Sequence, residues 1–306
     1  MLRILQSVQP FSYLLSLGTF VLMFGLLLFG QGGLEMFKID YWWLSFGAVG
    51  LGLLWNRMVN SNEFKNREQT LTFWFWCLLG GLLVFLHRDW TWVVCNGLMA
   101  AMFFHLGPIH RQQDTKNQYF NAAFFGGLAV CLNFNYCWLL LGLLISLSYT
   151  RSGLWREWAW SFIGFLLPSM MKIVLFWLFS EDFDWFLEWM STFQMVPKEW
   201  SFHWGFIPLL VLIGWGLMNF FGTYIESSIK GRNTRTVWVI MSLSYILCGV
   251  FESKFQFSSI AIWLLPFSSV LLGFCLNSQR VPWWKKALFW LFLSTYSLSV
   301  VGQIFN

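Results

Sequence analysis

Charged residues are scarce in this sequence. Only 11% of its 306 residues are Asp, Glu, Lys or Arg, whereas 58% are hydrophobic. A soluble chain carries about a quarter charged residues, so the scarcity argues against an ordinary soluble enzyme and predicts a membrane protein. The apolar segments recur from residue 11 to the end with short polar breaks, which leaves no stretch for a separate soluble domain. We therefore expect one integral membrane domain over residues 1–306.

Motifs for cofactors are also missing. The six cysteines show neither CxxC nor CxxCH spacing, so the sequence indicates no metal site and no disulfide framework. There is no Walker or GxGxxG loop, so a bound nucleotide is not indicated. The net charge is +5, but the basic residues are spread over short loops and do not form one face or arm, which argues against a nucleic-acid partner. We expect no cofactor and no metal.

The apolar segments have lengths that suit membrane helices. A tilted helix crosses the hydrocarbon core with about 20 apolar residues. The sequence therefore predicts an all-α, polytopic transmembrane bundle of about eleven spans, over residues 11–30, 41–55, 71–86, 91–107, 119–132, 136–149, 158–179, 205–224, 237–250, 258–276 and 287–302. Residues 133–136, Asn-Phe-Asn-Tyr, predict a tight hairpin between two short helices. Whether these two helices cross fully or form a re-entrant hairpin stays open.

The basic residues predict how the spans are oriented. Lys and Arg concentrate in cytoplasmic loops, and the N-terminus is accordingly placed in the cytoplasm of a bacterial inner membrane, with the C-terminus outside. Treating 119–149 as one span would move six later basic residues to the outer side, which favours the hairpin. Fourteen of the nineteen basic residues fall on the inner side: Arg3, Arg57, Lys65, Arg67, Arg111, Lys116, Arg151, Arg156, Lys230, Arg232, Arg235, Arg280, Lys285 and Lys286.

Three stretches resemble a known family. They read LLWNRMVNSNEFKNREQTLTFWFW, YFNAAFFGGLAVCLNF and WREWAWSFIGFLLP, and lie between residue 51 and about residue 180. Together they resemble an uncharacterised family of polytopic inner-membrane proteins of Bacteroidota-type bacteria, a domain of unknown function. The resemblance covers less than half of the chain and implies a polytopic fold but no activity. The matching residues are Asn56, Asn60, Arg67, Thr70, Phe120 to Ala122, Trp155 to Trp158, Gly164 and Pro168.

Lys172 is a cation inside a predicted span. It lies in GFLLPSMMKIVLFWLF, residues 164–179, four residues after Pro168. We expect it roughly 11 to 12 Å below the outer interface at 1.5 Å per residue. A charge at such depth costs about 2.5 to 3.5 kcal/mol on insertion scales, so it either lines a wet cavity or snorkels outward along its stem. Pro168 removes a backbone hydrogen bond and predicts a kink, which together with the cation suggests a cavity wall.

The longest outer loop, residues 180–204, predicts an amphipathic interfacial helix, because Phe183, Phe186, Leu187 and Met190 recur at helical spacing. Carboxylates one turn apart on such a helix share a face and are candidates for acid–base chemistry, although a solvated polar face explains them too. The candidate catalytic residues are Asp184, Glu188, His203, Glu35 and Asp40. Outward cations can hold a diphosphate, and the candidate substrate-binding residues are Lys172, Arg88 and Asp89.

Two functions are compatible with these patterns. The first is an inner-membrane protein of cell-envelope biogenesis, glycosyltransferase-like or ligase-like, whose outward-opening cavity takes an anionic lipid or a polyprenyl-phosphate-linked sugar. Lys172 would lie near the floor of this cavity and the 181–204 helix would cover it. Its partners would be membrane lipids and a polyprenyl-linked glycan. The second is a non-enzymatic membrane subunit of a secretion or envelope-assembly complex, whose partners would be other membrane-protein subunits. The sequence leaves open whether the protein is an enzyme.

Overall fold

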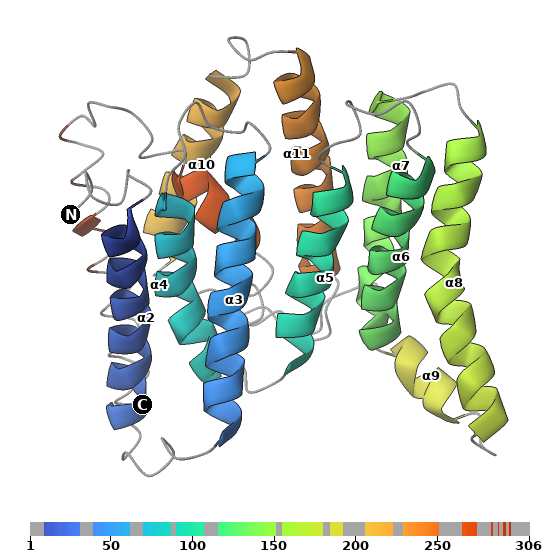
Figure 1. Ribbon diagram of the computed structural model, residues 1–306, viewed down its shortest axis with the longest axis horizontal. Coiled ribbons are helices and arrows are strands. Elements are labelled where there is room, and N and C mark those ends of the chain that lie inside the picture. Colours follow the sequence, from blue (N-terminus) through green and yellow to red (C-terminus); the bar gives the residue numbers. More distant parts are fainter. Residues whose placement is uncertain are drawn as a thin grey trace. The chain divides into compact units, whose positions relative to one another are not determined.

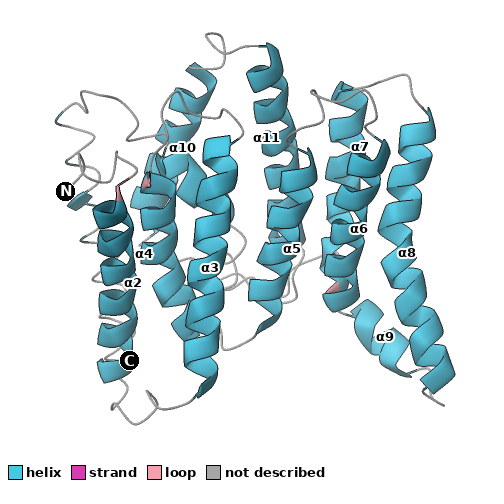
Figure 2. Ribbon diagram, viewed as in Figure 1, coloured by secondary structure: helices cyan, strands magenta, loops and turns pink. Residues whose placement is uncertain are grey.

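The computed structural model describes residues 9–30, 39–61, 70–86, 90–106, 116–150, 155–179, 184–191, 206–222, 229–250 and 265–273, together with 283, 287, 290, 291 and 294. Every regular element within these ranges is helical, as Figure 2 shows. The predicted all-α fold is therefore confirmed for the described part of the chain.

Each of the first ten predicted apolar segments overlaps a helix. Leu71–Leu86 (α4) has the predicted bounds, and residues 265–273 form a helix inside the tenth predicted segment. Most of the eleventh, 287–302, lies outside the described residues. The other elements are α2 (Pro10–Gly30), α3 (Ile39–Ser61), α5 (Trp90–Leu106), α6 (Lys116–Leu132), the 3₁₀ helix η3 (Phe134–Cys137), α7 (Trp138–Thr150), α8 (Trp155–Phe179), α9 (Asp184–Ser191), α10 (Phe206–Gly222) and α11 (Ile229–Val250).

The chain forms two compact units, each described here by itself. The first comprises residues 1–93, 202–226 and 264–306, and the second comprises residues 94–201 and 227–263. In the first unit α4 packs against α2 and α3. Trp76 of α4 is fully buried, stacks on Trp55 at 6.2 Å between ring centroids, and donates from its indole Nε1 to the carbonyl oxygen of Ala48 at 2.8 Å. This buried indole is fully paired, so α3 and α4 are joined by both packing and a hydrogen bond.

In the second unit α6 lies along α8, beside α7 (Figure 1). Small residues allow the two backbones to approach closely. A Cβ on Gly164 would lie 2.7 Å from the carbonyl oxygen of Phe120, and one on Gly127 would overlap the carbonyl oxygen of Phe165. Pro168, inside α8, lies against the same Gly127. A larger side chain at either glycine would force α6 and α8 apart.

The predicted hairpin after α6 is confirmed as two helices joined by η3. Asn133 has extended backbone angles, φ −146° and ψ 123°, and its Oδ1 accepts a hydrogen bond from the backbone N–H of Asn135 at 3.0 Å. An asparagine in this conformation is a favourable N-cap. The chain therefore ends α6, turns through one short 3₁₀ helix, and begins α7.

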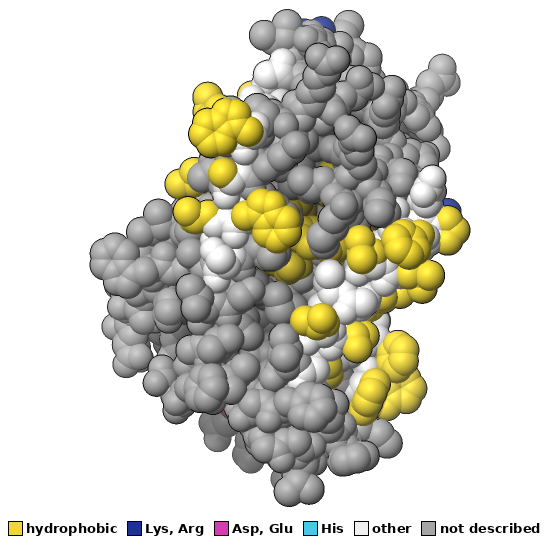
Figure 3. Space-filling model, turned by 90° about the vertical axis from the view of Figure 1, so that its left-hand side faces the viewer, with side chains coloured by type: hydrophobic (Ala, Val, Ile, Leu, Met, Phe, Trp, Pro, Cys, Tyr) yellow, Lys and Arg dark blue, Asp and Glu magenta, His cyan; other side chains and the backbone are white. Residues whose placement is uncertain are grey.

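Exposed apolar surface is extensive. In the face that Figure 3 shows, many of the described side chains at the surface are hydrophobic. Among the described helices, α8 alone is both long and apolar enough to cross a membrane, with 25 residues, and only 17% of its most apolar window is buried. Its second half exposes a run of large side chains: Met170, Met171, Val174, Leu175, Phe176, Trp177, Leu178 and Phe179.

Candidate functional site

The side chain of Lys172 is directed to the end of α6. Its Nζ donates a hydrogen bond to the carbonyl oxygen of Cys131 at 2.6 Å. Cys131 lies in the last turn of α6, where the carbonyl groups have no partner within the helix. The C-terminal end of a helix also carries partial negative charge, which favours a cation. Lys172 therefore caps α6 from the neighbouring helix α8.

Trp189 of α9 completes the same cap. Its indole Nε1 donates to the carbonyl oxygen of Val130 at 3.0 Å, and the Nζ of Lys172 lies 4.7 Å from the centroid of its ring. Phe134 packs edge-on against this ring, with centroids 4.9 Å apart. Two consecutive carbonyl groups of α6 thus receive their hydrogen bonds from two different helices. The cation–π contact joins the two donors to each other.

The packing of α6 on α8 determines where the lysine lies. Pro168 sits against Gly127 at the close approach of the two helices, and Lys172 follows one turn later on α8. Because residues four apart lie on the same helix face, Lys172 emerges towards the last turn of α6. Pro168 and Lys172 are one turn apart on α8, and the contact that they frame is the end of a neighbouring helix. The kink at Pro168 stays a prediction.

The energies at this cap are nearly balanced. A hydrogen bond to a charged group contributes about 1.5 to 3 kcal/mol, and a cation–π contact contributes about 0.5 to 2 kcal/mol. In the membrane placement that the sequence predicts, burying a lysine costs about 2.5 to 3.5 kcal/mol. In that placement the cap adds little to the overall stability. Its main effect is to fix the relative positions of α6, α8 and α9.

The predicted amphipathic segment contains α9, which is shorter than the predicted helix. Trp189 is buried, with 8% of its surface exposed, whereas Leu187, Glu188 and Met190 are exposed. Figure 1 shows α9 beside the ends of α6 and α8. The face that carries Trp189 holds α9 on the bundle, and the opposite side of the helix is open.

The structure places the predicted site residues as follows. Lys172 is half-buried at the cap and Glu188 is exposed on α9, and in the described part of the chain no ion pair joins them. Asp184 and Asp40 lie in the first turns of α9 and α3, and their side chains are outside the described set. Four further predicted residues lie outside the described residues: Glu35, Arg88, Asp89 and His203.

Sequence reasoning missed Trp189 and the two carbonyl groups of α6. The sequence leaves a cavity wall and outward snorkelling open for Lys172, and the contacts add a third role, a helix cap. Trp189 is 59 residues from its partner Val130 in sequence, and nothing local marks such a pair. The sequence does place two small residues, Ala123 and Gly127, four positions apart on α6. This spacing is typical of close helix packing and indicates that α6 has a close neighbour.

The chemistry of the site suits an anion. An ammonium group has three N–H donors and no acceptor, whereas the single N–H of the neighbouring indole is already donated to the carbonyl oxygen of Val130. Within the described ranges, no group of three or more His, Cys, Asp or Glu side chains lies together in a way that could hold a metal ion. The ammonium group could therefore donate a hydrogen bond to a phosphate or carboxylate oxygen of a ligand.

Comparison with known proteins identifies the family. A model described as a family of unknown function, DUF6427, matches residues 1–302. The chain therefore belongs to this family, and the expectation of an uncharacterised family is confirmed. No curated protein and no solved structure matches the chain.

Proposed function

We propose that this member of the DUF6427 family is an integral protein of the bacterial inner membrane that acts in cell-envelope biogenesis. In this proposal the chain crosses the membrane about eleven times, with the N-terminus in the cytoplasm, as the distribution of Lys and Arg predicts. The apolar surface of α8 supports a membrane location. Exposing so many large side chains to water would cost about 25 cal/mol for each Å² of apolar area.

The proposed ligand is an anionic lipid or a polyprenyl-phosphate-linked sugar, bound beside Lys172. The observation that carries this proposal is the half-buried ammonium group between Cys131 and Trp189. One of its three N–H donors is directed to the Cys131 carbonyl, so donor capacity is left for a phosphate oxygen. Hydrogen bonds of a cation to an oxyanion are about twice as strong as neutral ones. A reaction on the bound headgroup would use the carboxylates of α9, Asp184 and Glu188.

A second function is favoured by the exposed end of α8. Trp177, Leu178 and Phe179 expose 69%, 62% and 85% of their surface. Aromatic side chains in such a patch are typical of contacts between proteins as well as of contacts with lipid. The alternative is therefore a non-enzymatic membrane subunit that docks α8 against a partner helix in a secretion or envelope-assembly complex.

The test is to purify the protein in mild detergent and to identify bound lipids and proteins by mass spectrometry. We expect a stoichiometric phosphate-bearing lipid in the wild type, retained in Lys172→Arg and lost in Lys172→Met. Lys116→Met is the matched control, because Lys116 is exposed at the opposite end of α6. Retention of the lipid by Lys172→Met would refute the proposed site. A stoichiometric protein partner without bound lipid would support the subunit role instead.

A further inference from the structure

The ammonium group of Lys172 has a neighbour for each of its three N–H bonds. Its Nζ donates to the carbonyl oxygen of Cys131 at 2.6 Å, and lies 4.7 Å from the ring centroid of Trp189 and 5.8 Å from that of Phe176. Cys131 belongs to α6 and Trp189 to α9, whereas Phe176 lies on α8 itself, four residues after Lys172. A phosphate oxygen that binds the ammonium group therefore takes the place of one of these neighbours.

The two aromatic neighbours differ in how firmly they are held. Trp189 exposes only 8% of its surface, its indole donates to the carbonyl oxygen of Val130, and the ring of Phe134 packs edge-on against it. Phe176 exposes 42% of its surface, and its distance from Nζ is close to the limit of about 6 Å for a cation–π contact. Phe176 is therefore the neighbour that a ligand displaces at the lower cost.

The exposed side of Phe176 belongs to an apolar surface. Leu175 and Phe179, which lie beside it on α8, are also exposed. In the proposed membrane placement this surface faces acyl chains, and hydrocarbon is a poor solvent for a free anion. An anion that approaches Lys172 past Phe176 must therefore be attached to a hydrocarbon chain.

We propose that Phe176 is the gate of the Lys172 site, and that a phosphate carried on a lipid, not free phosphate, displaces its ring to reach the ammonium group. Trp189 keeps its contacts when the ligand binds, so α9 stays docked. This inference rests on the proposed function, because it requires a ligand at Lys172. It adds the route by which the ligand enters and the residue that controls the route.

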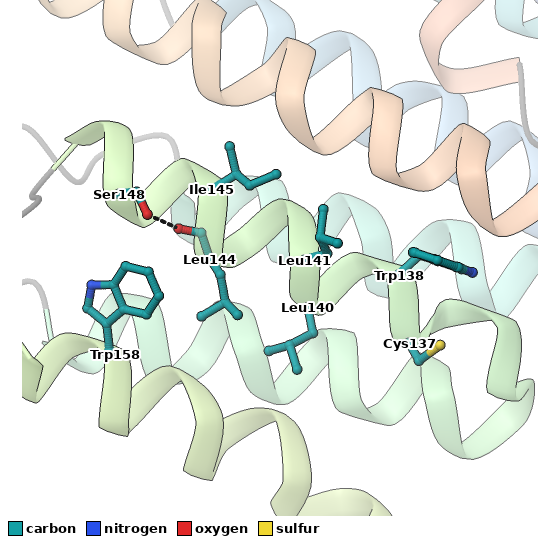
Figure 4. Close-up of a pocket in the computed structure, with 8 residues that line it drawn as sticks. All are labelled: Cys137, Trp138, Leu140, Leu141, Leu144, Ile145, Ser148 and Trp158. Atoms are coloured by element: carbon teal, nitrogen blue, oxygen red, sulfur yellow. Dashed lines mark hydrogen bonds between the residues drawn. The ribbon is translucent and has the colours of Figure 1, made fainter.

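The experiment must separate phosphate binding from the binding of hydrocarbon chains to other apolar surfaces. One such surface is a groove of about 410 Å³ in the second unit, lined by the end of η3, by α7 and by the first turns of α8 (Figure 4). None of the described residues that line it is charged. Diacylglycerol with the same chains as phosphatidic acid, but without the phosphate, therefore reports chain binding alone.

The full-length protein is purified in mild detergent and titrated with phosphatidic acid, diacylglycerol or inorganic phosphate, and the bound ligands are read by native mass spectrometry. We expect the wild type to bind phosphatidic acid more tightly than the other two, and Lys172→Met to lose this preference. Phe176→Ala should bind phosphatidic acid about two- to fivefold more tightly, because no cation–π contact is lost on binding. Phe179→Ala is the matched control, an exposed phenylalanine of the same helix, and should bind like the wild type.

Hydrogen exchange of residues 184–191 reports which ring is displaced, and should not change when phosphatidic acid binds to the wild type. Faster exchange would show that the ligand displaces Trp189, which overturns the gate. Unchanged or weaker binding in a Phe176→Ala protein that melts like the wild type, or inorganic phosphate bound as tightly as phosphatidic acid, would also overturn it. If Phe176→Ala does not fold, Phe176→Leu decides, because it removes the aromatic ring but keeps apolar bulk. Preference for phosphatidic acid in Lys172→Met would instead refute the proposed function.

Discussion

Replacing Lys172 with methionine should release α9 from the bundle while changing the overall stability little. The substitution removes the cation–π contact with Trp189, which is the only described contact between Lys172 and α9. It also removes the hydrogen bond to Cys131, but that bond joins α8 to α6. In the proposed membrane placement, the loss of this bond is offset by the roughly 2.5 to 3.5 kcal/mol that placing a charge at membrane depth costs.

The magnitude follows from the one contact that α9 loses. A cation–π contact contributes about 0.5 to 2 kcal/mol, which corresponds to a rise of about 2- to 30-fold in the undocked population of α9. With eight residues, α9 is too short to be a stable helix alone. Undocking therefore exposes its amide groups to exchange. Hydrogen exchange of a peptide covering 184–191, followed by mass spectrometry, measures the opening directly.

Two further variants sharpen this test. Trp189→Phe keeps an aromatic ring but removes the donor to the Val130 carbonyl, and should raise exchange in α9 by a similar factor, since a neutral hydrogen bond contributes about 0.5 to 1.5 kcal/mol. Lys116→Met, at the other end of α6, should leave α9 unchanged. If α9 exchanges in Lys172→Met at the rate of the wild type, the cap does not hold α9 and our account of the site is wrong.

Three other substitutions test the frame around the site. Gly164→Leu should lower the melting temperature strongly, because the new side chain would meet the Phe120 carbonyl, whereas Gly214→Leu, where nothing lies within 4 Å, should change it little. Asn133→Ala should destabilise the turn after α6 by about 1 kcal/mol in equilibrium unfolding, and Asn133→Ser should restore most of the loss. Single cysteines placed in residues 226–236 should react with a thiol reagent supplied from the cytoplasm; labelling from the periplasm only would reverse the proposed orientation after residue 119.

Helix positions could be predicted from the sequence because apolar runs and their polar breaks are local signals. The break at residues 133–136 correctly predicted two helices in place of one. The start of α11 was predicted eight residues too late, at 237, because hydrophobicity marks only the apolar part of a helix, and the first turns of this helix are polar. A helix satisfies its own backbone hydrogen bonds and can therefore extend beyond the apolar segment.

The role of Lys172 could not be predicted in the same way. Its partner Cys131 is 41 residues away in sequence, and the contact depends on the register in which α6 packs on α8. The small residues at 127 and 164 were available as a packing signal and would have brought these two helices together. They would not have identified the Cys131 carbonyl as the partner of Lys172. The cap also requires that the turn at Asn133 end α6 beside Lys172.

The short helices of the hairpin explain why a cation is placed there. Thirteen residues in α7 rise only about 20 Å, less than a hydrocarbon core of about 30 Å. In the proposed orientation α6 begins and α7 ends at the inner interface, so the turn between them lies at membrane depth, where water cannot satisfy the last carbonyl groups of α6. Lys172 and Trp189 supply the missing donors.

We expect the half-buried thiols beside the turn, Cys131 and Cys137, to be shielded from a charged, membrane-impermeant thiol reagent in the wild type. They should become reactive in Lys172→Met combined with Trp189→Phe, because release of α9 uncovers the turn. Reaction is read by mass spectrometry of the peptide that contains both cysteines. Rapid labelling of either cysteine in the wild type would place the turn in water, and a water-exposed helix end would have no need of a lysine from its neighbour.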